Sequence, residues 1–499
     1  MSIDLEIPAV RSARNRFWDI ALISATLTAI FHFLPGDRPF GIAFAVFVVS
    51  LAVGMVMLAG LAQKPLNRWS FVLLIPALLC ALADALYSSP VVQALAFIVS
   101  LTSLTFFAFW LTVPQIKFGH IKSLWPVMFI KETLWPVRSL SQALTGIKGD
   151  RRLGGVAIGI IVAIPFLLIF ISIFSSADQL FSKSFSGLFQ SNDFGTYVFK
   201  TIRDLIVGIF FLASGSTMLS RLVEERKPTD GGGRTVGLDQ TVYVTFLALI
   251  NILFLVFVAF QFAYFFGGQA WVATQGITYA DYARQGFFQL LFASGLVFAI
   301  TWALYWLTDM RQRWTKILTI VMIAQTGIII VSALKRLMLY VDAYGLTLAR
   351  WWAAFCIILI GLTLLAIAAF AIAKAAYAPV SKFAFLGILI ITSLALLIPS
   401  ERTIARYNVD RFLANNGLRL DFGYLDSLSS DAIDERIRLA SSEWPSDQDG
   451  YRYTGPTDRG SYVGQLKNER DQFRARFSKL GLGASLSDHW AMDALEGLK

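Results

Sequence analysis

Long apolar runs dominate the first four-fifths of the chain. Eleven blocks of about twenty apolar residues fall between residues 17 and 399, and a polar stretch of about one hundred residues follows them. The hydrocarbon core of a bilayer is about 30 Å thick, so about twenty residues of helix cross it. Most blocks are apolar on all faces and lack the alternation of a β-barrel. The pattern predicts an all-α, polytopic transmembrane bundle of about eleven spans with a mainly helical C-terminal extramembrane region.

The blocks set the predicted organisation of the chain. The predicted spans are 17–34, 39–61, 70–88, 91–113, 153–174, 202–219, 241–266, 287–308, 317–334, 351–373 and 381–399. They define an N-terminal four-span region (1–113), a basic inner segment (114–152), a seven-span region (153–399) and a C-terminal extramembrane region (400–499).

Capping residues predict three helices in the C-terminal region. The first covers 402–415 and ends before Gly417, which supplies a left-handed C-cap. Ser429 or Ser430 can cap the second, over 431–441. The third covers 460–479. A loop rich in Ser, Asp, Gly and Pro separates the last two.

The net charge of +10 belongs to the membrane part of the chain. The C-terminal region holds 14 basic and 16 acidic residues, so it does not favour nucleic-acid binding. With the N-terminus inside, the inner segments hold 21 Lys and Arg and the short outer loops hold 8. This is the positive-inside bias, and it predicts a cytoplasmic N-terminus and an extracytoplasmic C-terminus.

The inner segment 114–152 interleaves basic and aromatic residues. Leu124-Trp125-Pro126-Val127 recurs as Leu134-Trp135-Pro136-Val137 among seven Lys and Arg residues. Tryptophan rings favour the membrane interface and cations favour anionic headgroups. We therefore expect the segment to lie against anionic lipid headgroups, with docking of a protein partner as the alternative.

Known catalytic and cofactor signatures are missing from the sequence. His32, His120 and His489 lie on separate segments without metal-ligand spacing, and Cys80 and Cys356 fall inside predicted spans. No nucleophile elbow or nucleotide-binding fingerprint occurs. We expect no catalytic residue, no metal and no cofactor, and an enzyme is the less favoured class.

Several polar residues lie within or beside the predicted spans. Asp84 is in the third span and is too short to reach water easily, so it is a candidate functional residue. The amides Asn251, Gln261 and Gln325 are expected to form hydrogen bonds between helices. Gly155-x-x-x-Gly159 is expected to allow two helices to approach closely.

The densest polar constellation leads into the eighth span. It reads Thr278-Tyr279-Ala280-Asp281-Tyr282-Ala283-Arg284-Gln285-Gly286-Phe287-Phe288-Gln289-Leu290. Thr278 can cap a helix here, and Asp281 and Arg284 can pair at i,i+3. An ordinary aromatic belt at the membrane surface would supply similar residues, so the residues alone leave both interpretations open.

This segment resembles a family of bacterial multi-pass inner-membrane proteins known as a domain of unknown function. The resemblance rests on a Tyr-Ala-x-Tyr-Ala-Arg-x-Gly-Phe-Phe-x-Leu motif, which Tyr279 to Leu290 match. Ile404-Ala405-Arg406-Tyr407-Asn408 and the stretch from Leu420-Asp421 to Asp431-Ala432 carry it further. The resemblance spans about 150–435 and departs at Gln289 and Asp434. It implies the membrane class and a bacterial cytoplasmic (inner) membrane location, and it brings no activity.

The two motif regions share the outer side in the predicted topology. We therefore expect a polar cluster there, with the C-terminal region packed over the outer ends of the seventh to tenth spans. The candidate residues of this cluster are Tyr279, Asp281, Tyr282, Arg284, Arg406, Tyr407, Asn408 and Asp421, with Asp84.

Three functions remain open from the sequence. The favoured one is a non-catalytic envelope component for sensing, recognition or assembly, with a possible protein partner in the envelope and the lipid bilayer around it. The alternative is a transporter or channel for a small solute or ion. The third is a membrane enzyme that acts on lipid or glycan at the outer leaflet, which would require Asp281 and Asp421 to converge.

Overall fold

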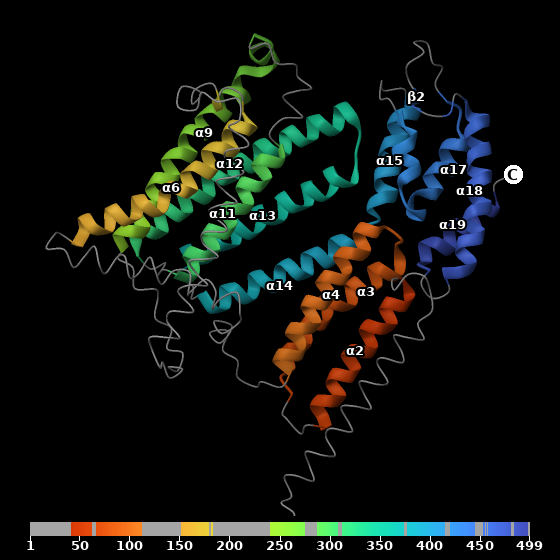
Figure 1. Cartoon of the computed structure of the whole chain (residues 1–499), viewed down its shortest axis with the longest axis horizontal. Helices are drawn as coiled ribbons and strands as arrows, with labels where there is room; N and C mark the ends of the chain where they lie inside the picture. Colours follow the sequence, from red (N-terminus) through yellow and green to blue (C-terminus); the bar gives the residue numbers. More distant parts are fainter. Residues whose placement is uncertain are drawn as a thin grey trace, which may run out of the picture. The chain divides into compact units, whose positions relative to one another are not determined.

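The structure is a computed structural model, and its elements are almost all helices (Figure 1). It describes residues 41–61, 66–111, 151–178, 181–182, 240–274, 287–307, 312–373, 377–414, 420–444, 453–454, 456, 458–480 and 484–497. The chain divides into two compact units. Unit 1 comprises Met1–Ile116, Tyr344–Leu348 and Phe385–Lys499, and unit 2 comprises Lys117–Ala343 and Ala349–Ala384.

The membrane part of unit 1 is built on a helical hairpin. The 3-10 helix η1 (Arg68–Leu73) leads into α3 (Leu74–Leu86), and α4 (Pro90–Leu111) returns beside it. Helix α2 (Ile42–Leu61) packs on both (Figure 1). Small and apolar residues fill the contact, and Ser103 donates a hydrogen bond to the backbone carbonyl of Leu73.

The C-terminal module comprises the described residues after Pro399. Its helices are α15 (Ser400–Leu413), α16 (Phe422–Ser427), η4 (Ser430–Ala432), α17 (Ile433–Ser441), α18 (Arg459–Leu480) and α19 (Leu486–Glu496). The two-residue strands β1 (Leu420–Asp421) and β2 (Tyr453–Thr454) pair in parallel. Its core gathers the rings of Phe412, Phe422, Trp444 and Tyr462, whose neighbouring centroids lie 5.2–6.1 Å apart.

Unit 2 is a bundle of long apolar helices. These are α6 (Arg151–Ala177), α9 (Gln240–Thr274), α11 (Phe287–Leu307), α12 (Arg313–Tyr344) and α13 (Leu348–Ile372). The last residue of α12, Tyr344, and the first residue of α13, Leu348, belong to unit 1. Phenylalanine rings fill the α6–α9 contact, and those of Phe174 and Phe257 stack at 3.9 Å. Helix α14 (Tyr377–Leu396) begins in unit 2 and ends in unit 1.

The close approach predicted from Gly155-x-x-x-Gly159 is confirmed. A Cβ atom at Gly155 would lie 2.9 Å from Cβ of Thr241, and one at Gly159 would lie 2.7 Å from Cβ of Thr245. The matched order of these contacts shows that α6 and α9 run parallel. This is the direction expected if the chain crosses the membrane once more between them, as the sequence predicts at 202–219, a segment outside the described residues.

Seven described helices are long and apolar enough to cross a membrane. They are Arg68–Leu86, Pro90–Ala108, Arg152–Ala177, Gln240–Gln261, Phe287–Leu304, Arg313–Tyr344 and Leu348–Ile372. An eighth is obtained if the pair Ala384–Leu396 and Ser400–Leu413, bent by 52°, counts as one span. The chain is therefore an integral membrane protein. The predicted total of eleven includes 17–34 and 202–219, both outside the described residues.

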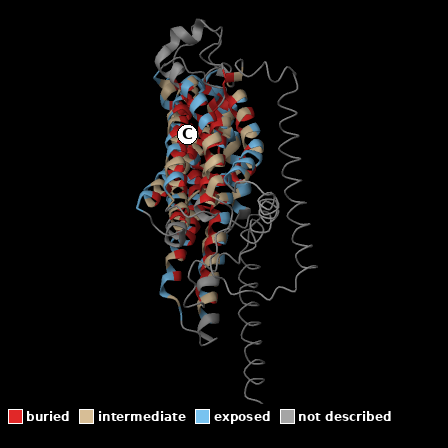
Figure 2. Ribbon diagram, turned by 90° about the vertical axis from the view of Figure 1, so that its left-hand side faces the viewer, coloured by how far each residue is buried: buried red, intermediate tan, exposed pale blue. Residues whose placement is uncertain are grey.

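Buried and exposed residues alternate along the helices (Figure 2). Large apolar side chains such as Phe292, Leu255 and Leu365 are exposed on the spans. In water such a surface would favour aggregation, whereas lipid covers it at no cost. The exposed apolar faces therefore support the membrane assignment.

The predicted helices of the C-terminal region match α15, α17 and α18 within two residues. Ser429 accepts a hydrogen bond from the backbone N–H of Asp431 and caps η4, which runs directly into α17. The sequence reading missed α19. This helix begins with a capping box in which Ser485 and Asp488 exchange side chain–backbone bonds.

Candidate functional site

A carboxylate of the C-terminal module holds the start of a membrane helix. Ser88 and Ser89 form the turn between α3 and α4, and Pro90 takes the first helical position, where no N–H is needed. The backbone N–H of Ser88 donates to Oδ1 of Asp431 at 2.8 Å, and that of Ser89 donates to Oδ2 at 3.3 Å. Negative charge at a helix N-terminus interacts favourably with the helix dipole. Asp431 thus ties the module to the α3–α4 turn.

Asp431 is almost completely buried by these contacts. Burial raises the pKa of its carboxyl group, and the nearby Glu401 raises it further. Hydrogen bonds from Ser487 and Ser88 act in the opposite direction without cancelling the effect of burial. The protonation state of Asp431 is therefore sensitive to anything that changes its exposure to water.

Hydroxyl groups extend this contact to α19. The Oγ atoms of Ser88 and Ser430 share a hydrogen bond, and Ser430 also donates to Oδ1 of Asp488 at 2.6 Å. The other oxygen of Asp488 accepts from the backbone N–H and the hydroxyl of Ser485, each at 2.9 Å. A continuous chain of hydrogen bonds therefore connects the start of α4 with the start of α19.

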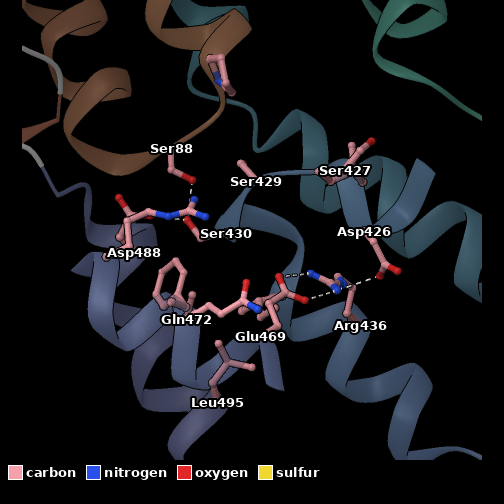
Figure 3. A pocket seen from close by; sticks show the side chains of 16 residues that line it. Ser88, Asp426, Ser427, Ser429, Ser430, Arg436, Glu469, Gln472, Asp488 and Leu495 are labelled. Carbon is pink, nitrogen blue, oxygen red and sulfur yellow. Dashed lines mark hydrogen bonds and ion pairs between the residues drawn. The ribbon is translucent and has the colours of Figure 1, made fainter. Parts of the chain in front are cut away.

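A cavity of about 290 Å³ opens beside this chain (Figure 3). It lies within unit 1, between the α3–α4 turn and the C-terminal module. Its lining residues are Ser88, Pro90, Asp426, Ser427, Leu428, Ser429, Ser430, Ile433, Arg436, Glu469, Gln472, Phe473, Arg476, Asp488, Ala491 and Leu495. Hydroxyl, carboxylate and guanidinium groups predominate, so the cavity suits a small polar ligand.

Arg436 forms one wall of the cavity and is fully buried. It donates to both oxygens of Glu469, at 2.9 and 2.6 Å, and lies 2.7 Å from Oδ1 of Asp426 (Figure 3). Its Nε donates to the hydroxyl of Tyr462. Burial by itself would lower the pKa of Arg436, but these partners outweigh it and the pKa is raised. Arg436 is therefore a charged structural anchor for α16, α17 and α18.

Two other polar side chains of the cavity are uncommitted. Gln472 and Arg476 lie four residues apart on one face of α18, and both line the cavity. Within the described part of the chain neither forms a hydrogen bond or an ion pair. Their amide and guanidinium groups are thus available to a ligand.

A second contact joins the module to the turn after Tyr344. Asn408 accepts from the backbone N–H of Leu346 at 2.9 Å and donates to the carbonyl of the same residue at 2.8 Å. The hydroxyl of Tyr424 accepts from the backbone N–H of Leu348. Gly345 has a φ of 78°, which a glycine adopts without strain. Among the candidate residues that the structure describes, Asn408 binds a turn between predicted spans.

The other candidate residues of the module have local roles. Arg406 lies 3.9 Å from Asp410 on the same helix, and Tyr407 accepts a hydrogen bond from Arg411. Asp421 accepts from the backbone N–H of Tyr424 and caps α16. Tyr279, Asp281, Tyr282 and Arg284 lie outside the described residues, so their predicted place in a shared cluster remains a prediction.

Asp84 joins two membrane helices at the same end of unit 1. It is fully buried near the end of α3, and its Oδ2 accepts from the backbone N–H of Gly41 at 2.6 Å. Gly41 precedes α2 and has a φ of 81°. The carboxylate therefore positions the start of α2. Its Oδ1 has no hydrogen-bond partner among the residues that the structure describes.

Unit 2 contains a separate buried cluster around Arg336. The guanidinium lies 3.4 Å from Oδ2 of Asp178, which follows α6, and it donates to the carbonyl of Ala177 at 2.9 Å. Gln261 of α9 accepts from Arg336 at 3.0 Å and from Ser332 at 2.7 Å, and it donates to Asp178 at 3.2 Å. The expected interhelical bonding of Gln261 is confirmed. The ion pair joins α6, α9 and α12.

The sequence reading missed several residues of these clusters. Ser88-Ser89-Pro90 between two apolar blocks is a recognisable helix start, and it predicts free N–H groups there. Its carboxylate partner is 342 residues away in the chain, and no local pattern connects them. The partners of Asp178 on other helices, Arg336 and Gln261, are likewise distant in the chain.

The described residues do not meet the requirements of a metal site. No group of three or more His, Cys, Asp or Glu side chains there could hold a metal ion. The site described above consists of hydrogen-bonding and ionic groups.

One family model matches the chain. It describes a domain of unknown function, DUF4153, and covers residues 21–439, which include both motif regions and most of the apolar blocks. No curated protein and no solved structure matches the chain. Since the matched region exceeds half of the sequence, the chain belongs to the family of proteins with the DUF4153 domain.

Proposed function

We propose that the protein is a non-catalytic envelope component that senses or recognises a small polar ligand or a partner through its C-terminal module. One observation carries the proposal. Ser88 lines the 290 Å³ cavity and also donates to Asp431 at the start of α4. A ligand that displaces the lining of the cavity would therefore disturb the attachment of a membrane helix.

The chemistry of the cavity supports ligand recognition. Arg436, Asp426 and Glu469 satisfy one another and keep the wall in place. Gln472 and Arg476 remain available for hydrogen bonds to a ligand. A fixed polar wall with a few uncommitted donors is the arrangement expected of a binding pocket.

The proposal places the protein in a bacterial inner membrane with the C-terminal module outside. The excess of Lys and Arg in the predicted inner segments supports this orientation. A cysteine at Ser478, in a chain freed of Cys80 and Cys356, should react with an impermeant maleimide from the outside of intact cells. A cysteine at Ser139 should react only after permeabilisation. The reverse pattern would exclude this orientation.

A filled cavity can be imitated by a bulky side chain. Gln472→Trp would occupy space in the cavity that Ser88 also lines, and Asn468→Trp is a matched control because Asn468 is exposed on the same helix and does not line the cavity. We expect faster amide hydrogen exchange at Ser88 and Ser89 in Gln472→Trp and no change in Asn468→Trp. Equal exchange in both variants would separate the cavity from the membrane helix and contradict the proposal.

The enzyme alternative receives no support from the carboxylate that it requires. Asp421 is used to cap α16, and its proposed partner Asp281 lies outside the described residues. The transport alternative draws on a different part of the molecule, the interface of α9 and α12.

A further inference from the structure

Helix α12 carries a polar stripe along its buried side. The buried polar residues of the stripe are Thr315, Thr319, Gln325, Thr326, Ser332 and Arg336. From Thr315 to Arg336 the helix rises about 32 Å at 1.5 Å per residue. This equals the thickness of a bilayer core, about 30 Å. A hydrophobic interface would need no such stripe, so its continuity requires an explanation.

One end of the stripe is engaged in a dense polar network. Arg336, Asp178, Gln261 and Ser332 form the network of ionic and hydrogen bonds described above. These residues are at most 3% exposed. The cluster therefore closes this end of the α9–α12 interface.

In the middle of the stripe, Thr319 and Thr326 donate to backbone carbonyls of their own helix, whereas two amides are engaged only through their nitrogen atoms. Nδ2 of Asn251, on α9, donates to the backbone carbonyls of Leu247 at 2.7 Å and Leu318 at 3.1 Å. Nε2 of Gln325 donates to the backbone carbonyl of Asn251 at 3.3 Å. A backbone carbonyl can only accept, so these contacts fix which end of each amide is the nitrogen.

The amide oxygens are left without donors. Oδ1 of Asn251 and Oε1 of Gln325 are buried, and within the described residues no group donates to either. The same holds for Oγ1 of Thr315 on the stripe and of Thr301 on α11. Buried acceptors in an apolar medium are costly unless something positively polarised meets them. Each of these oxygen atoms could interact favourably with a cation.

We propose that the α9–α12 interface is a binding site for a monovalent cation, held by the side-chain oxygens of Asn251 and Gln325. Neutral amide and carbonyl oxygens replace the hydration shell of Na⁺ or K⁺ in ion-selective proteins. A divalent cation would require carboxylates, and the middle of the stripe has none. The site goes beyond the proposed sensing function and uses residues of unit 2 alone.

Cation-dependent stability of the purified full-length protein tests the site. Thermal unfolding in detergent is compared in NaCl, KCl and N-methylglucamine chloride at equal ionic strength, together with equilibrium binding of ²²Na⁺ and ⁸⁶Rb⁺. A bound cation raises the midpoint of unfolding with its concentration. We expect a higher midpoint in NaCl or KCl than in N-methylglucamine chloride, and saturable binding of one of the two isotopes.

Leucine substitutions identify the ligands. Asn251→Leu and Gln325→Leu each remove one oxygen and add an apolar side chain that a membrane interior tolerates. We expect each to weaken isotope binding by about tenfold or more, which corresponds to about 1.4 kcal/mol. Gln93→Leu makes the same change on α4 of unit 1, where Gln93 is buried, and should leave binding unchanged.

Two results would overturn the proposal. The first is a wild-type protein whose unfolding midpoint is the same in all three salts and that binds neither isotope. In that case, the oxygens are met by water or by other parts of the chain. The second is isotope binding that persists in both Asn251→Leu and Gln325→Leu. Folding of the variants is controlled by their midpoints in N-methylglucamine chloride.

Discussion

The C-terminal module and the α9–α12 interface use polar residues in opposite ways. In the module, Arg436 is buried against Asp426 and Glu469, and each of these carboxylates is bound. In the interface, the amide oxygens of Asn251 and Gln325 lack donors among the described residues. Water can reach the edge of the module, whereas the interface lies within a span. The Arg336 cluster at one end of the interface is engaged much as the module is, so the contrast concerns the two amides in the middle of the interface.

This difference separates structural from functional polarity. A saturated network such as that of Arg436 fixes the geometry of its helices and has no capacity left for a ligand. An unsaturated group in a membrane interior is expensive, and it is retained where a ligand completes it. The cavity combines the two, since a saturated wall faces the uncommitted Gln472 and Arg476.

The largest effect is expected when the central residue of the Arg436 network is removed. Arg436→Ala would leave Asp426 and Glu469 without their shared cation, and the loss of one partner of a buried pair costs about 3–5 kcal/mol. Because both carboxylates are partly exposed, we expect the free energy of unfolding of the module to fall by about 3 kcal/mol. Pulse proteolysis of the full-length protein in detergent measures it.

An exposed ion pair provides the control for this prediction. Arg474 lies 2.6 Å from Glu496, and its side chain is 61% exposed. Arg474→Ala should therefore cost less than about 1 kcal/mol. Equal losses in Arg474→Ala and Arg436→Ala would mean that the buried network contributes nothing special to the module.

The stability of unit 2 should depend on the close packing of its helices more than on charged side chains. Gly159→Ala places a Cβ atom 2.7 Å from Thr245 and 2.9 Å from the carbonyl of Val242, so α6 and α9 must separate. We expect a loss of about 1–3 kcal/mol in the free energy of unfolding. Gly327→Ala meets no atom within 4 Å and should stabilise α12 by up to about 1 kcal/mol.

Steric trapping or unfolding in mixed detergent measures both glycine variants. If Gly159→Ala were as stable as Gly327→Ala, the close α6–α9 contact would not be a determinant of the bundle. Unit 2 would then have to rely on polar contacts as the module does.

The smallest expected effect is a dependence on pH. Burial raises the pKa of Asp431, and burial also raises that of Asp426 despite the nearby Arg436. At pH values between the unfolded and the folded pKa of these carboxyl groups, the folded module therefore retains protons that the unfolded chain has released. This contribution to stability is complete below the unfolded pKa of about 3.9 and is lost as the pH rises through the raised folded values.

Urea unfolding of the module between pH 4 and pH 7, monitored in detergent, measures this slope. Asp431→Asn should reduce the slope of stability against pH, because the asparagine amide does not titrate in this range. Gln472→Ala changes an uncharged residue of the same cavity and should leave the slope as in the wild type. A slope unaffected by Asp431→Asn would show that other groups cause it.

The sequence predicted the parts of the molecule that local patterns encode. Apolar blocks predict the spans, Ser429 or Ser430 predicts the start of the η4–α17 segment, and Gly155-x-x-x-Gly159 predicts a close helix contact. Helix α19 (LSDHWAMDALE) was missed because it is only eleven residues long, although the capping pattern Ser485-x-x-Asp488 marks its start.

The candidate site was predictable only in part. Asn408 was identified from a motif and does bind a turn between spans. Asp431 lay in the same motif region, but its role depends on Ser88 and Ser89, more than three hundred residues earlier. Charge pairs such as Asp178–Arg336 require the packing of helices that are distant in the chain, and no periodicity reveals them.

Amide hydrogen exchange at Ser88 and Ser89 tests the attachment of the module most directly. Asp431→Ala removes the acceptor of both N–H groups, and hydrogen bonds to a charged group contribute about 1.5–3 kcal/mol. Exchange at these two amides should therefore be about ten to one hundred times faster than in the wild type, while Asp421→Ala, which removes only the cap of α16, leaves it unchanged. Unchanged exchange in Asp431→Ala would contradict the account.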